Sequence, residues 1–227
     1  MYTKRTIADA IRHRVVPILL VVVTLAAAGL FTATPVRAAT IYVSGTISSN
    51  ETWTADNVYV INGDLTIAAG VTLTIEAGTV VKFQYQSFVY SMRRMVVNGT
   101  LDLQGTTVNP VVFTSERDDT YGGDTNGDGY ATLPAAGDWG YIQFTNTSVD
   151  NVFEYAIVRY GGCRNDGGDL FYILWVDRAG ISIQHALLEH SYNDGLYIYR
   201  SDTDPAVTVQ YCTFRLNNGS GVRVVSP

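Results

Sequence analysis

Short runs of β-branched and aromatic residues alternate with polar residues throughout the chain after residue 40, and Gly, Asn and Asp separate the runs. No apolar pattern with the period of a helix occurs in this part of the sequence. Alternation with a period of two is typical of β-strands, and Gly, Asn and Asp are typical of the turns between them. The pattern therefore predicts an all-β protein after residue 40.

The strand-like runs repeat along the chain. The segment ISIQHALLEHSYNDGLYIY, which begins at Ile181, aligns without a gap on VTVQYCTFRLNNGSGVRVV, which begins at Val207. FEYAIVRYGG, which begins at Phe153, aligns on residues 183–192, and residues 63–83 and 96–115 follow the same pattern. A period in the twenties with short strands and no helix is typical of a solenoid in which each repeat forms one coil.

A solenoid coil buries one residue in two along each strand, and stacking places equivalent residues of successive coils about 4.8 Å apart. The alignment predicts that Ile183 stacks on Val209 and Leu188 on Phe214. A β-sandwich also has many short strands, but the ungapped repeats favour the solenoid. The predicted inward residues are Leu65, Ile67, Leu73, Ile75, Ile181, Ile183, Ala186, Leu188, Leu196, Ile198, Val207, Val209, Cys212, Phe214, Val222 and Val224.

Several of these segments carry a resemblance to a known group of proteins. NGTLDLQGTTVNPVVFTS, GDWGYIQF followed by FEYAIVRYGG, and the coils of the form I-x-I-x(2)-A-x-L-x(6)-G-L-x-I resemble secreted bacterial right-handed parallel β-helix repeat proteins, the pectate-lyase-like group. The resemblance covers about residues 57–225 and implies a right-handed parallel β-helix over 57–227, with a lead-in or cap at 39–56. That fold carries lyases, hydrolases, adhesins and passive surface spacers, so the resemblance selects no function.

Residues 1–38 have the features of an N-terminal signal peptide and are set apart from the fold. Four Lys or Arg residues lie within the first 14 positions, residues 15–33 are almost all apolar, and Val36-Arg37-Ala38 then has small residues at positions 36 and 38, where a signal peptidase would cut. An uncleaved anchor is the alternative, because the apolar run approaches the length of a membrane span. The polar, strand-like region that follows favours cleavage, so we predict a secreted or cell-surface protein with no membrane contact after cleavage.

The chain that remains after this cleavage is acidic. Removing residues 1–38 takes away five of 15 basic residues and one of 21 acidic residues, which leaves ten against twenty. Nucleic acid is excluded as a partner because its phosphates would be repelled. Only two cysteines are present, and they fall on coils two steps apart, beyond the Cα separation that a disulfide accepts. We predict no bond between Cys163 and Cys212, and a buried free thiol at Cys212.

The repeat alignment assigns some polar and aromatic residues to ladders that run from coil to coil. Arg159, Glu189 and Arg215 share one ladder, and Tyr155, His185 and Tyr211 share another. The first ladder is either a catalytic site, as in lyases of this fold that use an arginine beside an acid, or an alternation of charge on a solvated face. We favour the charge ladder.

Catalytic signatures of the pectate-lyase-like group are incomplete in this sequence. The Gly-His-Gly of polygalacturonase-type hydrolases is absent, and the Asp118-Asp119 pair lies in an insertion. Trp175-Val176-Asp177-Arg178 resembles the Trp-x-Asp-His of pectate lyases in its first three residues, but arginine replaces the histidine. No residue is therefore assigned a catalytic role.

The segment DTNGDG, residues 124–129, resembles the start of a calcium-binding loop. Asp124, Asn126 and Asp128 occupy positions 1, 3 and 5 of that pattern, but position 12 is Ala135 in place of the bidentate glutamate. The insertion around it, residues 116–138, has six acidic residues and a single basic one. We expect a structural calcium ion, the alternative being a solvated acidic loop. The residues that would complete its coordination shell are Glu116, Asp118 or Asp119.

These observations favour an exported, non-catalytic surface or matrix module that binds polysaccharide or a cell-surface protein. The candidate residues for stacking against sugar rings are Trp175, Tyr192, Tyr197 and Tyr199. The alternative is a polysaccharide lyase or glycoside hydrolase that uses Arg159, Glu189 and Arg215. Because the chain stops inside a coil, we also expect that the sequence is truncated at its C-terminus.

Overall fold

The regular structure of the described residues, which are 38–86, 92–164 and 170–227 of the computed structural model, consists of strands alone. These residues fall in one unit, Arg37–Pro227. In this part of the chain there is no helix, and hence none that could cross a membrane. The predicted signal peptide, residues 1–38, lies outside the described residues except for its last position.

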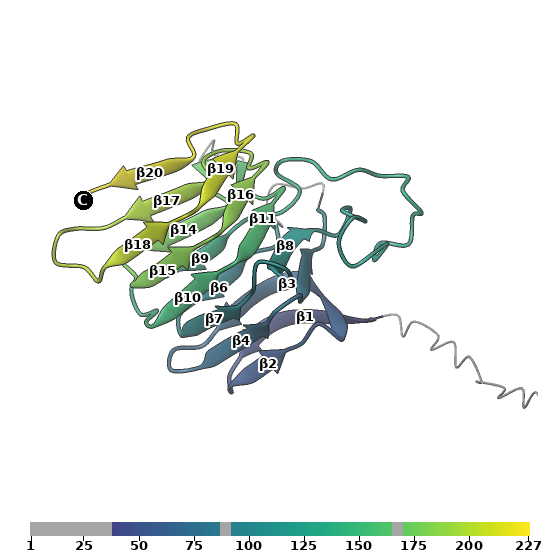
Figure 1. Ribbon diagram of the computed structural model, residues 1–227, viewed down its shortest axis with the longest axis horizontal. Helices are drawn as coiled ribbons and strands as arrows, with labels where there is room; N and C mark the ends of the chain where they lie inside the picture. The colour runs from purple at the N-terminus through teal and green to yellow at the C-terminus, as the bar shows by residue number, and fades with distance from the viewer. Residues whose placement is uncertain (1–37, 87–91, 165–169) are drawn as a thin grey trace, which may run out of the picture. The chain divides into compact units, whose positions relative to one another are not determined.

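The strands form three rows, named here after one strand of each (Figure 1). The β10 row contains β2 (Glu51–Trp53), β4 (Thr72–Glu76), β7 (Thr100–Gln104), β10 (Asn151–Glu154), β15 (Ile181–Gln184) and β18 (Val207–Gln210). The β11 row contains β5 (Val80–Phe83), β8 (Val111–Ser115), β11 (Ala156–Arg159), β16 (Leu187–Glu189) and β19 (Thr213–Arg215). The β14 row contains β6 (Met95–Val97), β9 (Ile142–Phe144), β14 (Leu174–Asp177), β17 (Leu196–Tyr199) and β20 (Val222–Val225).

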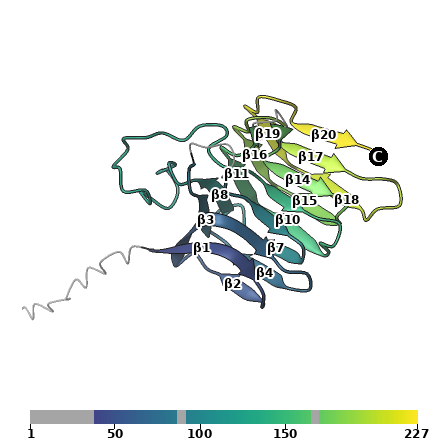
Figure 2. The same cartoon turned by 180° about the vertical axis from the view of Figure 1, so that it is seen from behind.

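The long strand β3 (Asn57–Ile67) joins two of the rows, because its first half pairs with β5 and its second half with β6. Strand β1 (Ala39–Ile47) pairs with β3 on its other side. The one antiparallel pair among the described strands is the hairpin of β12 (Cys163–Arg164) and β13 (Leu170–Phe171). Every other pairing is parallel, and the chain visits the three rows in turn, which is consistent with the predicted right-handed parallel β-helix (Figure 2).

The coil-to-coil register agrees with the sequence alignment. Ile183 pairs with Val209 across β15 and β18, and Leu188 pairs with Phe214 across β16 and β19, both in parallel strands. The predicted stacking is therefore confirmed, and with it the ladders that the same alignment assigned.

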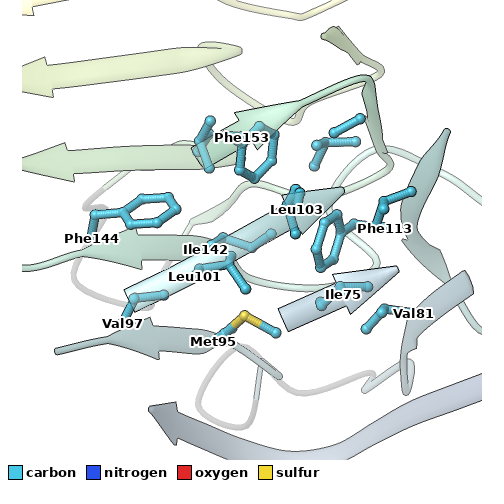
Figure 3. Close-up of a cluster of buried hydrophobic side chains, with 14 of the residues drawn as sticks. Ile75, Val81, Met95, Val97, Leu101, Leu103, Phe113, Ile142, Phe144 and Phe153 are labelled. Carbon is cyan, nitrogen blue, oxygen red and sulfur yellow. The ribbon is translucent and has the colours of Figure 1, made fainter. Parts of the chain in front are cut away.

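The core is a column of apolar side chains enclosed by the three rows. Phe113 from β8, Phe144 from β9 and Phe153 from β10 are fully buried and meet inside the coils (Figure 3). Complete burial of one such ring contributes about 1.5–3 kcal/mol to folding. The predicted inward residues from Leu65 through Ile198 are all buried.

The prediction of burial was wrong for the last coil. Val207, Val209 and Phe214 are only partly buried, and Val222 and Val224 are exposed. The reason is that β18, β19 and β20 form the final coil of the described chain, and an inward side chain is covered fully only by coils on both sides.

The two cysteines are free, as predicted. The prediction that Cys212 is buried was wrong, because Cys212 is half-buried; Cys163, for which no burial was predicted, is buried. Cys212 lies in the last coil and shares the partial exposure of its neighbours there. Burial raises the pKa of the Cys163 thiol to about 12.

Candidate functional site

The insertion between β8 and β9 leaves the coils as a long loop (Figure 1). Two buried carboxylates attach its ends to the coils. Asp118 accepts hydrogen bonds from the Thr114 hydroxyl at 2.6 Å and from the Thr120 backbone N–H at 3.2 Å. Asp138 accepts a hydrogen bond from the Ser115 hydroxyl at 2.8 Å. The loop is thus fixed at its base by the last two residues of strand β8, whose hydroxyls donate to a carboxylate near each end of the insertion.

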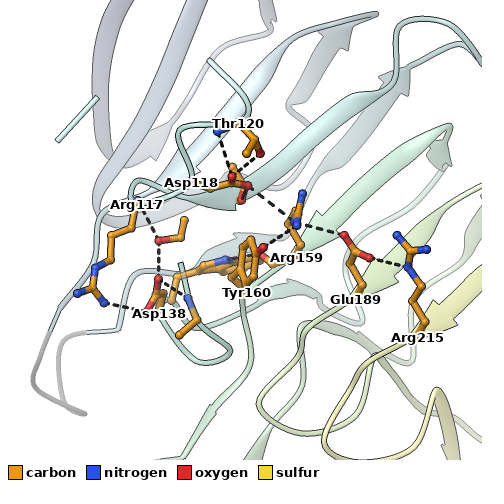
Figure 4. A network of polar contacts seen from close by, with 12 residues as sticks. Arg117, Asp118, Thr120, Asp138, Arg159, Tyr160, Glu189 and Arg215 are labelled. Carbon is orange, nitrogen blue, oxygen red and sulfur yellow. Dashed lines mark hydrogen bonds and ion pairs between the residues drawn. The ribbon is translucent and has the colours of Figure 1, made fainter. Parts of the chain in front are cut away.

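The predicted charge ladder exists and continues into the insertion (Figure 4). Arg159 Nε lies 3.3 Å from Glu189 Oε1 and 3.8 Å from Asp118 Oδ2, and Arg215 Nε donates a hydrogen bond to Glu189 Oε2 at 2.7 Å. Glu189 and Asp118 are buried, whereas Arg215 is more than half exposed. Each buried carboxylate of the ladder therefore has a guanidinium beside it, which suits a structural network that links coils to the insertion.

The metal candidates divide into two groups. Carboxylate oxygens of Asp119, Asp124 and Asp128 lie within 4.8 Å of one another. Glu116 instead accepts a hydrogen bond from the Tyr85 backbone N–H at 2.8 Å, and Asp118 belongs to the ladder. We call Asp119, Asp124, Asp128 and the neighbouring Asn126 the acidic cluster.

Short-range hydrogen bonds hold the DTNGDG turn in place. Asp124 Oδ1 accepts from the Gly127 N–H at 2.6 Å, and Asp124 Oδ2 accepts from the Gly129 N–H at 2.9 Å. Both glycines have positive φ, 74° and 61°, which a side chain would disfavour. The Thr132 hydroxyl and neighbouring backbone N–H groups lower the pKa of Asp128, whereas burial, followed by repulsion from Asp124, raises the pKa of Asp119.

Two oxygens of the acidic cluster fit a cation. Asp119 Oδ1 and Asn126 Oδ1 are buried and have no hydrogen-bond partner among the described residues. Buried acceptors without a partner are rare in folded proteins and cost free energy. A hard cation such as calcium takes oxygen ligands of this kind.

A cation from the coils also faces the insertion. Lys82 on β5 is completely buried, and its Nζ donates a hydrogen bond to the Gly123 carbonyl oxygen at 2.5 Å. Burial lowers the pKa of Lys82, and the nearby carboxylates of Asp119, Asp118, Asp124 and Glu116 act in the opposite direction. Lys82 lies outside the insertion in the sequence, so the charge count of the insertion did not include it. The sequence does single out this residue, because Lys82 is the only lysine after residue 38.

A pocket of about 300 Å³ lies where the insertion meets the ladder. Asp119 of the acidic cluster and Asp118 of the ladder both line it, together with Tyr160, whose hydroxyl accepts a hydrogen bond from Arg159 Nη2 at 2.6 Å. The other lining residues are Arg117, Thr120, Tyr130, Thr132, Leu133 and Pro134.

A group of aromatic side chains lies on the β14 row. Trp175 on β14 and Tyr197 on β17 occupy paired positions, with ring centroids 6.3 Å apart at 76°. Tyr172 stacks on Tyr197 at 3.9 Å, and Phe171 of the hairpin stacks on Tyr141 at 5.2 Å. Tyr141 meets Trp175 edge-on at 5.8 Å, so the five rings are continuous and form what we call the aromatic face.

The predicted stacking residues are only partly brought together. Trp175 and Tyr197 belong to the aromatic face, and Tyr199 follows two residues later on β17, with the Arg178 guanidinium 6.0 Å from its ring. Tyr192 lies in the loop after β16, where its N–H donates to the Gly161 carbonyl, and within the described chain no ring contact joins it to the others. Tyr141, Phe171 and Tyr172 could not be predicted from the repeat alignment because they lie outside the aligned segments.

Polar groups border the aromatic face. Gln143 pairs with Trp175 on one side, and Arg223 pairs with Tyr197 on the other. Arg223 is about half exposed, and its Nε donates to the fully buried Asp194 at 2.6 Å. The Trp175 indole Nε1 is buried and has no hydrogen-bond partner in the described residues.

Three rows of parallel strands wound into coils, with ladders of equivalent side chains on their outer surface, define a parallel β-helix protein. A family model described as a pectate-lyase-like beta helix domain matches residues 45–200, and the chain belongs to this family. Comparison with curated proteins found no match, and comparison with solved structures found none either.

Proposed function

We propose that this chain is an exported, non-catalytic β-helix module that binds polysaccharide through its aromatic face. The observation that carries the proposal is the paired position of Trp175 and Tyr197 within a continuous group of five rings. Binding sites for small ligands and sugars combine aromatic surface with a few polar groups that fix orientation. Gln143 and Arg223 supply such groups at the edges of this face.

Affinity measurements on a polysaccharide panel test this proposal. Trp175→Ala and Tyr197→Ala are expected to weaken binding at least tenfold, since each removes a large aromatic contact. Tyr42→Ala on β1 is the control, because Tyr42 is 55% exposed and lies outside the aromatic face. Equal binding by the Trp175 variant and the control would exclude this face as the binding site. Selective capture of a cell-surface protein that carries no glycan would show that the ligand is a protein and not a polysaccharide.

We also propose that calcium binds the acidic cluster and orders the insertion. Asp119, Asp124, Asp128 and Asn126 would hold the ion, and the support is the presence of two buried oxygens without hydrogen-bond partners. An ion here would supply positive charge to carboxylates that repel one another, so its role would be structural.

A polysaccharide lyase or hydrolase is the second candidate. The observation that favours it is the pocket of about 300 Å³ beside the ladder, which is lined by both Asp118 and Asp119. Against it, the carboxylates of Asp118 and Glu189 are already engaged by Arg159 and Arg215. Incubation with the same panel, followed by absorbance of unsaturated ends and by reducing-end assays, separates the two. Product that disappears in Arg159→Ala and Glu189→Ala would establish an enzyme.

A further inference from the structure

Three aromatic residues form a stack at the corner where the β10 row turns into the β11 row. Tyr155, His185 and Tyr211 each follow the last residue of a strand in the β10 row. Their rings are nearly parallel: the Tyr155 and His185 centroids are 4.5 Å apart at 3°, and those of His185 and Tyr211 are 4.9 Å apart at 11°. The ladder predicted by the repeat alignment is thus a continuous ring stack.

The backbone at this corner is unusual for such residues. Tyr155, His185 and Tyr211 have φ values of 46°, 52° and 55°, in the left-handed region. The same conformation recurs at the next corner of each coil, where Tyr160, His190 and Leu216 have φ values of 67°, 54° and 55°, so it is a regular feature of the coil turns. An asparagine would fit the same backbone with less strain, so the corner does not require an aromatic residue for geometry alone.

An open groove runs beside the ring stack. Its volume is about 320 Å³, and we call it the corner groove. Ile157 and Leu187, which pair across β11 and β16, form an apolar wall. The loop after β7 contributes Thr107 and Pro110. The lining residues of the groove therefore come from four successive coils.

The chemistry of the lining selects an uncharged ligand. No Asp, Glu, Lys or Arg lines the corner groove, although the chain as a whole carries 36 such residues. The hydroxyls of Thr107, Tyr155 and Tyr211 and the imidazole of His185 have no side-chain hydrogen-bond partner in the described part of the chain. They are free to meet hydroxyl groups, while Ile157, Leu187 and the rings offer apolar contact.

We propose that the corner groove binds a segment of a neutral linear polysaccharide whose chain runs along the stack of coils. An elongated, uncharged polymer with apolar ring faces and many hydroxyls matches the length, the lack of charge and the mixed lining of the groove. The site shares no residue with the aromatic face, so it does not depend on the function proposed above. With both sites occupied, one molecule would bind two polysaccharide segments, and the combined binding would exceed that of either site.

The test uses cellohexaose, xylohexaose and mannohexaose as probes, with isothermal titration calorimetry on the purified protein. His185→Asn removes the central ring but suits the left-handed backbone, so the fold is retained, and the melting temperature checks this. Binding of at least one hexasaccharide is expected, with a loss of about tenfold in His185→Asn. Tyr155→Asn should have the same effect, whereas Trp175→Ala should leave this component unchanged.

The two sites can fail separately. If Trp175→Ala removes all binding and His185→Asn changes none, the corner groove is excluded and the aromatic face stands. If His185→Asn removes binding and Trp175→Ala does not, the groove stands and the aromatic face is excluded. Absence of binding to all three hexasaccharides, or stronger binding of the neutral peptide (Gly-Ser)3, would overturn the inference.

Discussion

The Glu189 carboxylate accepts a hydrogen bond from Arg215 Nε at 2.7 Å, across two successive coils of the solenoid. On its other side Glu189 faces Arg159, whose Nε lies 3.3 Å from Oε1. A buried acid between two cations links three coils through side chains, in addition to the backbone ladder. The same network reaches the insertion through Asp118.

Glu189→Ala should destabilise the protein by about 3–5 kcal/mol, because Arg159 is mostly buried and would lose one of its two counter-charges. Urea denaturation followed by circular dichroism measures the change. Arg215→Ala is the matched control: its side chain is 58% exposed, so solvent screening limits its loss to about 1 kcal/mol or less. Equal losses for the two variants would contradict this account of the ladder.

The ladder also indicates how far the sequence could predict the site. Arg159, Glu189 and Arg215 were assigned correctly because the repeat is ungapped and a parallel stack preserves register. Asp118 could not be added, since it lies in an insertion to which no repeat register applies. Tyr172 and Phe171 could not be predicted for the same reason. The burial of Lys82 could not be predicted either, because the insertion that covers it folds back over strand β5.

The fold was predictable for a related reason: a period of two along each strand and a repeat between strands are both local patterns. Burial in the last coil was not, because it depends on a neighbouring coil and not on the residue itself. Cys212 and Ala186 are equivalent in the repeat, yet Ala186 is 2% exposed while Cys212 is only half-buried.

This difference predicts unequal thiol reactivity. Burial raises the pKa of both thiols, that of Cys163 to about 12, so almost no Cys163 thiolate is present at pH 8, and the Cys163 side chain is also inaccessible. Cys212 should therefore react with iodoacetamide faster than Cys163 in the native protein, as measured by mass spectrometry of the modified peptides. In urea the two should react alike. Faster labelling of Cys163 under native conditions would show that its coil opens.

Asp138 should make stability depend on pH. Burial raises the pKa of Asp138 above its ordinary value of 3.8, despite hydrogen bonds from Ser115 and Ala135 and the nearby Arg117. Between 3.8 and the raised value, the folded protein binds more protons at this site than the unfolded chain. The contribution of this group to stability therefore increases as pH falls through that window and is lowest above it.

Asp138→Asn removes this titration while it keeps an oxygen for the Ser115 and Ala135 donors. The difference in unfolding free energy between wild type and Asp138→Asn should therefore change with pH, with the wild type gaining relative to the variant as the solution is acidified. Urea denaturation at a series of pH values measures it. A difference that is constant, or that changes in the other direction, would show that the Asp138 pKa is not raised.

Calcium should stabilise the insertion if the acidic cluster binds it as proposed. Calcium at 100 times its dissociation constant would add about 2.7 kcal/mol to the unfolding free energy, so the melting temperature should rise with calcium and fall with a chelator. Asp124→Ala should abolish this difference, because it removes a carboxylate that also holds the Gly127 and Gly129 N–H groups of the turn. Asp202→Ala, in an exposed position outside the insertion, should preserve the effect of calcium on the melting temperature.

Calorimetry that detects no calcium uptake at millimolar concentration would show that the DTNGDG segment is only a charged turn. If the Asp124→Ala variant instead lost polysaccharide turnover while its coils remained folded, the ion would have a catalytic role. An ion that only orders this loop would not change turnover in a folded protein.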